Sequence, residues 1–139
     1  MNNNFEQISL KQGFMKHNGG ILFKTISENE YQFKATITEN HLNAAGITHG
    51  GFIAAFVDAG AGTAAHRSAG NSPCVTISLE LKFISAVRLG QELIGNTKIQ
   101  KKTKTMVFLT SELTAGNRIV ATASGIWKIL KLTGAGPGG

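Results

Sequence analysis

Alternating apolar and polar residues predict six strands along this chain. From Val75 to Phe83, apolar side chains occupy every second position and polar ones lie between them. This period of two predicts a long strand with one buried face. Similar patterns predict further strands at about residues 21–27, 31–38, 92–101, 105–114 and 118–130. The sequence Ala115-Gly116-Asn117-Arg118 is typical of a tight hairpin turn.

A different pattern occupies residues 49–68, where the apolar residues lie on every side of a helix and Asp58 is the only carboxylate. Such a segment predicts a long helix that is buried all round. Its glycines cost about 1 kcal/mol each relative to alanine in a helix, which suggests a packing reason for them. An ionised carboxylate in apolar surroundings is costly unless it is paired, so Asp58 is a candidate functional residue.

These elements predict an α+β architecture. We expect an antiparallel sheet of five to six strands around the helix at about 49–68, with the last four strands possibly forming a meander. A short amphipathic helix is expected within residues 5–16. Residues 1–132 form a single domain in this interpretation, and 133–139 a flexible glycine-rich tail. A sheet covers a helix only in part, so we expect a second subunit to cover the remainder.

Composition sharpens this picture. Only 16% of residues are charged, which is low for a free monomer and favours a buried subunit interface. Fourteen Lys and Arg against eight Asp and Glu give a formal net charge of +6, which favours anionic partners. The basic residues are scattered and no RNA-binding signature occurs, so a small ligand bearing phosphates fits as well as nucleic acid does.

The cysteine count and the lack of long apolar runs bear on location and on metal binding. The single cysteine, Cys74, permits neither an intramolecular disulfide nor a cluster of cysteine metal ligands, and is compatible with a reducing cytosol. The first residues lack the pattern of a signal peptide, and no uncharged apolar run reaches the roughly 20 residues of a membrane span. We therefore expect a soluble, cytoplasmic protein without a metal, in which Cys74 packs rather than reacts.

The segment from Asn43 to Gly51, which contains His49-Gly50-Gly51 and is followed by Asp58, resembles the hotdog-fold thioesterases of the PaaI-like, phenylacetate-pathway type. The strand from Val75 to Phe83 and the turn at 85–92 extend the resemblance over nearly the whole chain. The resemblance implies hydrolysis of an acyl-CoA thioester to a carboxylic acid and coenzyme A, with no separate cofactor. It also implies a homodimer with active sites at the subunit interface, commonly paired into a homotetramer, and no nucleic-acid or membrane partner.

The resemblance assigns roles by matching position. The Gly51 N–H at the helix start would polarise the thioester carbonyl, which agrees with the positive end of the helix dipole there. Asp58 of the partner subunit would act as general base or as nucleophile. Asn43 and His49 would orient the thioester, and Thr76 would hold the water. Substrate contacts are further expected from Gly50, Phe52, Lys82, Phe83 and Arg88, the basic residues meeting the phosphates of coenzyme A.

Each assignment has a structural alternative. Asp58 could bond a neighbouring element, His49 could cap the helix, Asn43 could be a turn residue, and Thr76 could lie on the solvated face of its strand. Two other functions also remain: an acyl-CoA-binding hotdog protein without catalysis, and a hotdog dehydratase or hydratase. The sequence does not identify the acyl group.

Overall fold

The computed structural model describes residues 4–131, within which one long helix crosses a single sheet. In chain order the elements are β1 (Glu6–Gln7), α1 (Phe14–His17), β2 (Leu22–Ser27), β3 (Glu30–Thr36), the 3₁₀ turn η1 (Glu39–His41), α2 (Gly50–Ser68), β4 (Cys74–Phe83), β5 (Glu92–Lys102), β6 (Met106–Ala115) and β7 (Arg118–Ile129). The predicted tail at 133–139 lies outside the described residues.

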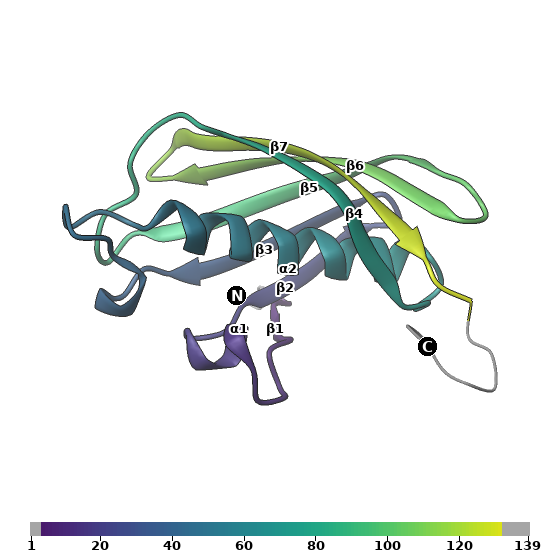
Figure 1. Cartoon of the computed structure of the whole chain (residues 1–139), viewed down its shortest axis with the longest axis horizontal. Coiled ribbons are helices and arrows are strands. Elements are labelled where there is room, and N and C mark those ends of the chain that lie inside the picture. Colours follow the sequence, from purple (N-terminus) through teal and green to yellow (C-terminus); the bar gives the residue numbers. More distant parts are fainter. Residues whose placement is uncertain (1–3, 132–139) are drawn as a thin grey trace.

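All strand pairs are antiparallel, and the sheet order is β1-β2-β3-β5-β6-β7-β4. The sheet curves around α2, and the segment that holds β1 and α1 lies on the opposite side of the helix (Figure 1). This is the hotdog architecture expected from the sequence. The four-strand meander is wrong, because β4 pairs with β7 at the edge of the sheet and β5 pairs with β3.

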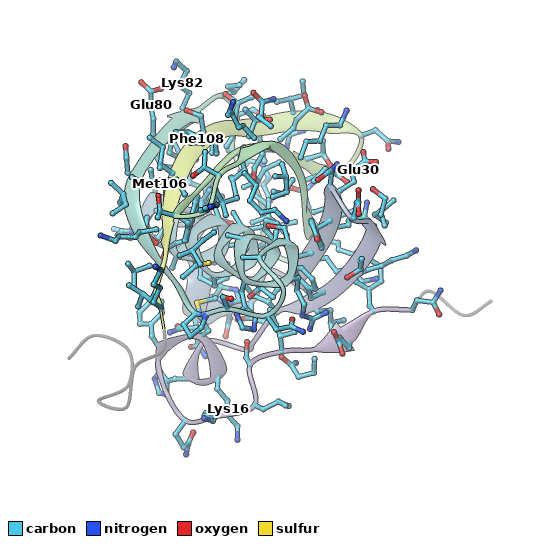
Figure 2. All side chains as sticks on the ribbon, turned by 90° about the vertical axis from the view of Figure 1, so that its right-hand side faces the viewer. Lys16, Glu30, Glu80, Lys82, Met106 and Phe108 are labelled. Carbon is cyan, nitrogen blue, oxygen red and sulfur yellow. The ribbon has the colours of Figure 1, made fainter. Side chains whose placement is uncertain are left out.

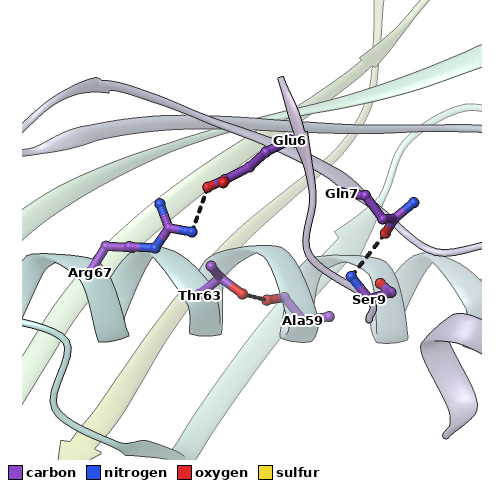
Figure 3. Close-up of polar contacts among 6 residues, drawn as sticks. All are labelled: Glu6, Gln7, Ser9, Ala59, Thr63 and Arg67. Carbon is purple, nitrogen blue, oxygen red and sulfur yellow. Dashed lines mark hydrogen bonds and ion pairs between the residues drawn. The ribbon is translucent and has the colours of Figure 1, made fainter. Parts of the chain in front are cut away.

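The N-terminal segment also differs from expectation. A helix forms only over Phe14–His17, whereas Glu6 and Gln7 pair with Phe23 and Leu22 as a seventh strand. Glu6 additionally accepts an ion-pair hydrogen bond from Arg67 of α2 at 2.6 Å (Figure 3). Pairing with the open edge of β2 thus outweighs the weak helical periodicity of this segment.

Close contact between α2 and the sheet depends on two glycines around Phe33. A Cβ on Gly60 would lie 2.2 Å from the Phe33 ring, and a Cβ on Gly95 of β5 would lie 2.4 Å from it. Phe33 is fully buried and also packs on Phe56, with ring centroids 4.9 Å apart. The packing reason expected for the helix glycines is therefore present at Gly60.

A β-bulge interrupts β4. Thr76 is opposite Trp127 and Ser78 is opposite Ile126, so Ile77 is an extra residue without a partner in the ladder. Residues opposite one another share a face of the sheet, and Trp127 is buried against the helix. The bulge therefore turns Thr76 to the helix side, which the strict alternation of the sequence had assigned to the opposite face.

Candidate active site

Two anchors fix the loop that leads into α2. Thr48 is buried, and both its backbone N–H and its hydroxyl donate to the carbonyl of Val87, at 2.9 and 2.8 Å. The carbonyl of His41 accepts from the N–H of His49 at 2.7 Å. The His41 ring is buried, stacks on Phe52 at 3.9 Å, and its Nδ1 accepts from the N–H of Thr38. These contacts hold the helix start in a fixed position.

His49 caps the helix. Its Nδ1 accepts the N–H of Gly51 at 2.7 Å, so that N–H is not free to bind a carbonyl as the sequence interpretation required. Within residues 4–131 the N–H of Gly50 makes no hydrogen bond. The first turn of α2 thus presents a free donor at Gly50 rather than at Gly51.

Beside this turn lies a groove of about 370 Å³, the helix-start groove, lined by Asn43, Ile47, Gly50, Ile53, Phe83 and Val87. The Asn43 side-chain oxygen accepts from the N–H groups of Ala45 and Ile47, at 2.9 and 3.3 Å, which closes the loop. Asn43 therefore does act as a turn residue. Because its oxygen is used in this way, its NH₂ group is left as the donor on the groove side.

Asp58 lies on a second groove, of about 590 Å³, which we call the acid groove; its lining includes Asp58, Gly62, Thr63, His66, Thr76 and Trp127. The Thr76 hydroxyl donates to Asp58 Oδ1 at 2.7 Å, so Thr76 contacts the acid. Asp58 is exposed in the single chain. The sheet and the N-terminal segment leave this side of α2 uncovered, and its burial by a second subunit stays a prediction.

The two grooves are separate on one chain. Gly50 and Asp58 are eight residues apart on α2, which corresponds to about 12 Å along the axis. A reacting carbonyl must lie within about 3 Å of both the N–H donor and the attacking group. One chain alone therefore does not bring the helix start and the acid to the same carbonyl.

The family of this chain follows from a comparison with known proteins. The family model of the thioesterase superfamily matches residues 45–122, more than half of the chain, including the helix start, α2, Asp58 and Thr76. The chain belongs to the thioesterase superfamily. This places it among enzymes that hydrolyse thioesters.

Individual similar proteins support the assignment to the thioesterase superfamily. A Pseudomonas aeruginosa protein, PA0474, that carries the word esterase in its name is 36% identical over 94 residues, covering 67% of this chain and 70% of the relative. Human acyl-coenzyme A thioesterase 13 is 30% identical over 78 residues, 56% of either chain. The structure of the Escherichia coli PaaI protein superposes with a TM-score of 0.77 at 19% identity, covering 88% of this chain and 84% of that one.

The residues expected to contact substrate are dispersed over this thioesterase-superfamily fold. Phe83 lies over the helix start, with its ring 3.4 Å from the position of a Cβ on Gly50. Phe52 is instead buried, stacked under His41. Lys82 pairs with Glu80 at 3.8 Å on the outer side of the sheet, where both side chains point into solvent (Figure 2), and Arg88 lies exposed in the turn before β5.

Neither the cysteine nor a metal centre offers an alternative site of reaction in the described residues. Burial raises the pKa of the Cys74 thiol above its ordinary value, which leaves it protonated and weakly nucleophilic at neutral pH. Residues 4–131 contain no group of three His, Cys, Asp or Glu side chains placed to hold a metal ion. No helix in the same range is long and apolar enough to cross a membrane.

Among the residues of the acid groove that sequence reasoning did not single out is Trp127. Its ring is 1% exposed yet forms part of the groove wall. It is the only tryptophan of the chain and lies in the last predicted strand. Its place beside Asp58 depends on strand register, for which the sequence carries no signal.

Proposed function

We propose that this protein hydrolyses acyl-CoA thioesters in a homodimer whose active sites each combine the helix start of one chain with the acid groove of the other. The observation that carries the proposal is the hydrogen bond between Thr76 and Asp58 beside an open groove, in a chain of the thioesterase superfamily. The name of the human relative supports acyl-coenzyme A as the substrate class. Pairing two such homodimers would give the expected tetramer.

The dimer follows from distance and exposure. The separation of about 12 Å between Gly50 and Asp58 supports a site that is completed by a second chain. β4 is an edge strand and exposes large apolar side chains: Val75, Ile77, Phe83 and the adjacent Ile84 are 44–57% exposed. An open edge with such residues favours pairing with another strand. Two β4 strands related by a two-fold axis would extend the sheets into one another.

The chemistry of the acid follows from the direction of its hydrogen bond. The Thr76 hydroxyl has one hydrogen, which it donates to Asp58, so its lone pairs can accept a hydrogen bond from a water molecule. The second carboxylate oxygen of Asp58 accepts the other hydrogen of that water and takes its proton during attack. Asp58 is therefore proposed as general base, with direct attack by its carboxylate as the alternative.

The thioester carbonyl would accept a hydrogen bond from the helix start of the other chain. There the Gly50 N–H is uncommitted, the Asn43 NH₂ group borders the same groove, and the helix dipole favours negative charge. Attack by water converts the carbonyl oxygen to an oxyanion, which such donors stabilise. Collapse of the tetrahedral intermediate then releases the thiolate of coenzyme A and the carboxylic acid.

The decisive experiment measures thiol release with a thiol-reactive dye over a panel of aryl- and alkyl-acyl-CoAs. Asp58→Asn keeps the shape and removes the base, so we expect kcat to fall by at least about 100-fold while the assembly stays intact by light scattering. Glu112→Gln, which changes an exposed carboxylate on β6, is the matched control and should retain wild-type turnover. Near-normal turnover of Asp58→Asn would exclude Asp58 as the catalytic group.

The same assay distinguishes the enzyme from a protein that binds acyl-CoA without hydrolysing it. If both wild type and Asp58→Asn bind acyl-CoA tightly and neither releases thiol, the protein is an acyl-CoA-binding module and the hydrolase proposal fails. Hydrolysis that is abolished in Asp58→Asn supports the enzyme, and the preferred member of the panel then identifies the acyl class.

A further inference from the structure

Trp127 lies flat between β7 and α2. On one side, a Cβ on Gly125 would lie 2.5 Å from its benzo edge. On the other, its nitrogen edge faces the helix, where Nε1 lies 3.2 Å from the position that a Cβ on Gly62 would occupy. Both Gly62 and Trp127 line the acid groove. The missing side chain at Gly62 therefore leaves a gap through which the indole nitrogen meets the groove.

The indole N–H has no partner in the described part of the chain. No residue between 4 and 131 accepts a hydrogen bond from it, although every fully buried side-chain nitrogen and oxygen in that range is hydrogen-bonded. This nitrogen is therefore accessible, although the residue as a whole is 1% exposed. Buried indoles usually satisfy their N–H, so a free one aimed into a groove beside an acid indicates an acceptor that binds there.

The other donors of this groove are already used. Thr76 donates to Asp58, and Thr63 donates to the carbonyl of Ala59 (Figure 3). His66 Nδ1 donates to the carbonyl of Ser72, which leaves its other nitrogen as an acceptor when the ring is neutral. Asp58 itself only accepts. Trp127 is thus the side chain in the groove that has an N–H to offer a ligand.

We propose that the Trp127 N–H donates a hydrogen bond to an oxygen atom of the molecule in the acid groove, and that Gly62 is required to let that oxygen approach. The inference rests on the proposed function insofar as the molecule is an acyl-CoA. Its oxygen then belongs either to the acyl group, as a hydroxyl or ketone, or to an amide carbonyl of the pantetheine arm. Trp127 determines acyl specificity in the first case and binds the coenzyme A part of every substrate in the second.

The test compares three substrates: hexanoyl-CoA and its 5-hydroxy and 5-oxo counterparts. Trp127→Phe removes the N–H, and Gly62→Ala places a methyl group over it. Each should lower kcat/KM about three- to tenfold on substrates whose oxygen uses the N–H. A loss confined to the 5-hydroxy and 5-oxo compounds assigns the oxygen to the acyl group, and an equal loss on all three assigns it to the pantetheine arm.

The control separates the hydrogen bond from packing. Val107 is fully buried opposite Trp127, so Val107→Ala opens a cavity beside the ring without touching the N–H. It should leave the ratios among the three substrates unchanged. Because Gly62→Ala retains the ring, it tests the inference even if Trp127→Phe folds poorly. Wild-type kcat/KM on all three substrates in Gly62→Ala would overturn the inference.

A readout independent of hydrolysis uses the fact that Trp127 is the only tryptophan. Fluorescence emission then reports on this ring alone while the protein is titrated with 2-oxoalkyl thioethers of coenzyme A, which carry a carbonyl but cannot be hydrolysed. A shift in emission that Gly62→Ala removes supports the inference even if no thioester is cleaved, so it separates this inference from the proposed function. An unchanged emission on saturating binding contradicts it.

Discussion

Individual residues divide the proposed chemistry between activation of water and stabilisation of charge. Thr76 and Asp58 are joined by a hydrogen bond of 2.7 Å, whereas the helix start offers the N–H of Gly50 because His49 occupies that of Gly51. Each function therefore depends on one hydrogen atom in a known place. Substitutions that remove only that hydrogen can test the two functions separately.

Thr76 can be tested by replacing its hydroxyl with a methyl group. Thr76→Val preserves the shape of the side chain and removes the group that would hold the water, so we expect kcat to fall about 10- to 100-fold with KM little changed. Thr76→Ser keeps the hydroxyl and should remain within a few-fold of wild type. Equal kinetics of the valine and serine variants would show that Thr76 has no part in the reaction.

Gly50 permits an unusually specific test of the oxyanion donor. It is the first residue of α2, a position that accepts proline, and His49 before it has the extended conformation that proline requires (φ −63°, ψ 132°). Gly50→Pro should lower kcat about 100- to 1,000-fold in the thiol-release assay because it removes the N–H. Gly50→Ala retains the N–H and introduces the same Cβ near Phe83, so it should stay active.

At the scale of elements, two glycines, which have no side chain, set how closely α2 packs against the sheet. Gly60 on the helix and Gly95 on β5 both border the ring of Phe33. The helix can therefore lie close to the sheet, and its other side, with Asp58, remains open to a partner. Helix packing and the exposure of the acid are thus two results of the same contact.

This packing predicts a coupled pair of substitutions. Gly60→Ala places a methyl group 2.2 Å from the Phe33 ring, so we expect it to lower the free energy of unfolding by about 1–3 kcal/mol in urea denaturation. Adding Phe33→Leu should recover part of this loss. Strict additivity of the two changes would show that they do not share one contact.

The sequence predicted the elements more successfully than the directions of single groups. Gly116 and Asn117 form the expected turn, both with positive φ, and α2 begins one residue after the predicted start, because turn chemistry and periodicity are local. The orientation of Thr76 depends on the bulge at Ile77, which an unbroken apolar alternation concealed. Capping by His49 was among the alternatives that the sequence offered, but its use of the Gly51 N–H depends on side-chain geometry, which the pattern does not determine.

At the scale of the whole molecule, the proposed dimer would give each chain half of two sites. Both grooves border the exposed edge strand β4, the acid groove at Val75 and Thr76 and the helix-start groove at Phe83. A two-fold axis near β4 would place each groove opposite the other kind on the partner. Activity is then a property of the pair.

Complementation tests this arrangement. Asp58→Asn and Gly50→Pro should each be nearly inactive, but hybrids formed by refolding equal amounts together would contain one site with both defects and one with neither. Random pairing makes half of the dimers hybrid, so about a quarter of wild-type activity should return. Activity of the refolded mixture no higher than that of the separately refolded variants would mean that each chain builds its own site.

The ring of Phe33 between Gly60 and Gly95 also constrains how this protein can evolve. A side chain at either glycine is costly while the phenyl ring is present, because the first added carbon overlaps the ring unless the ring shifts. A lineage that gains alanine at either position recovers stability when it accepts a smaller residue at 33. These three positions are therefore expected to covary in natural sequences because of the available space rather than because of selection on the reaction.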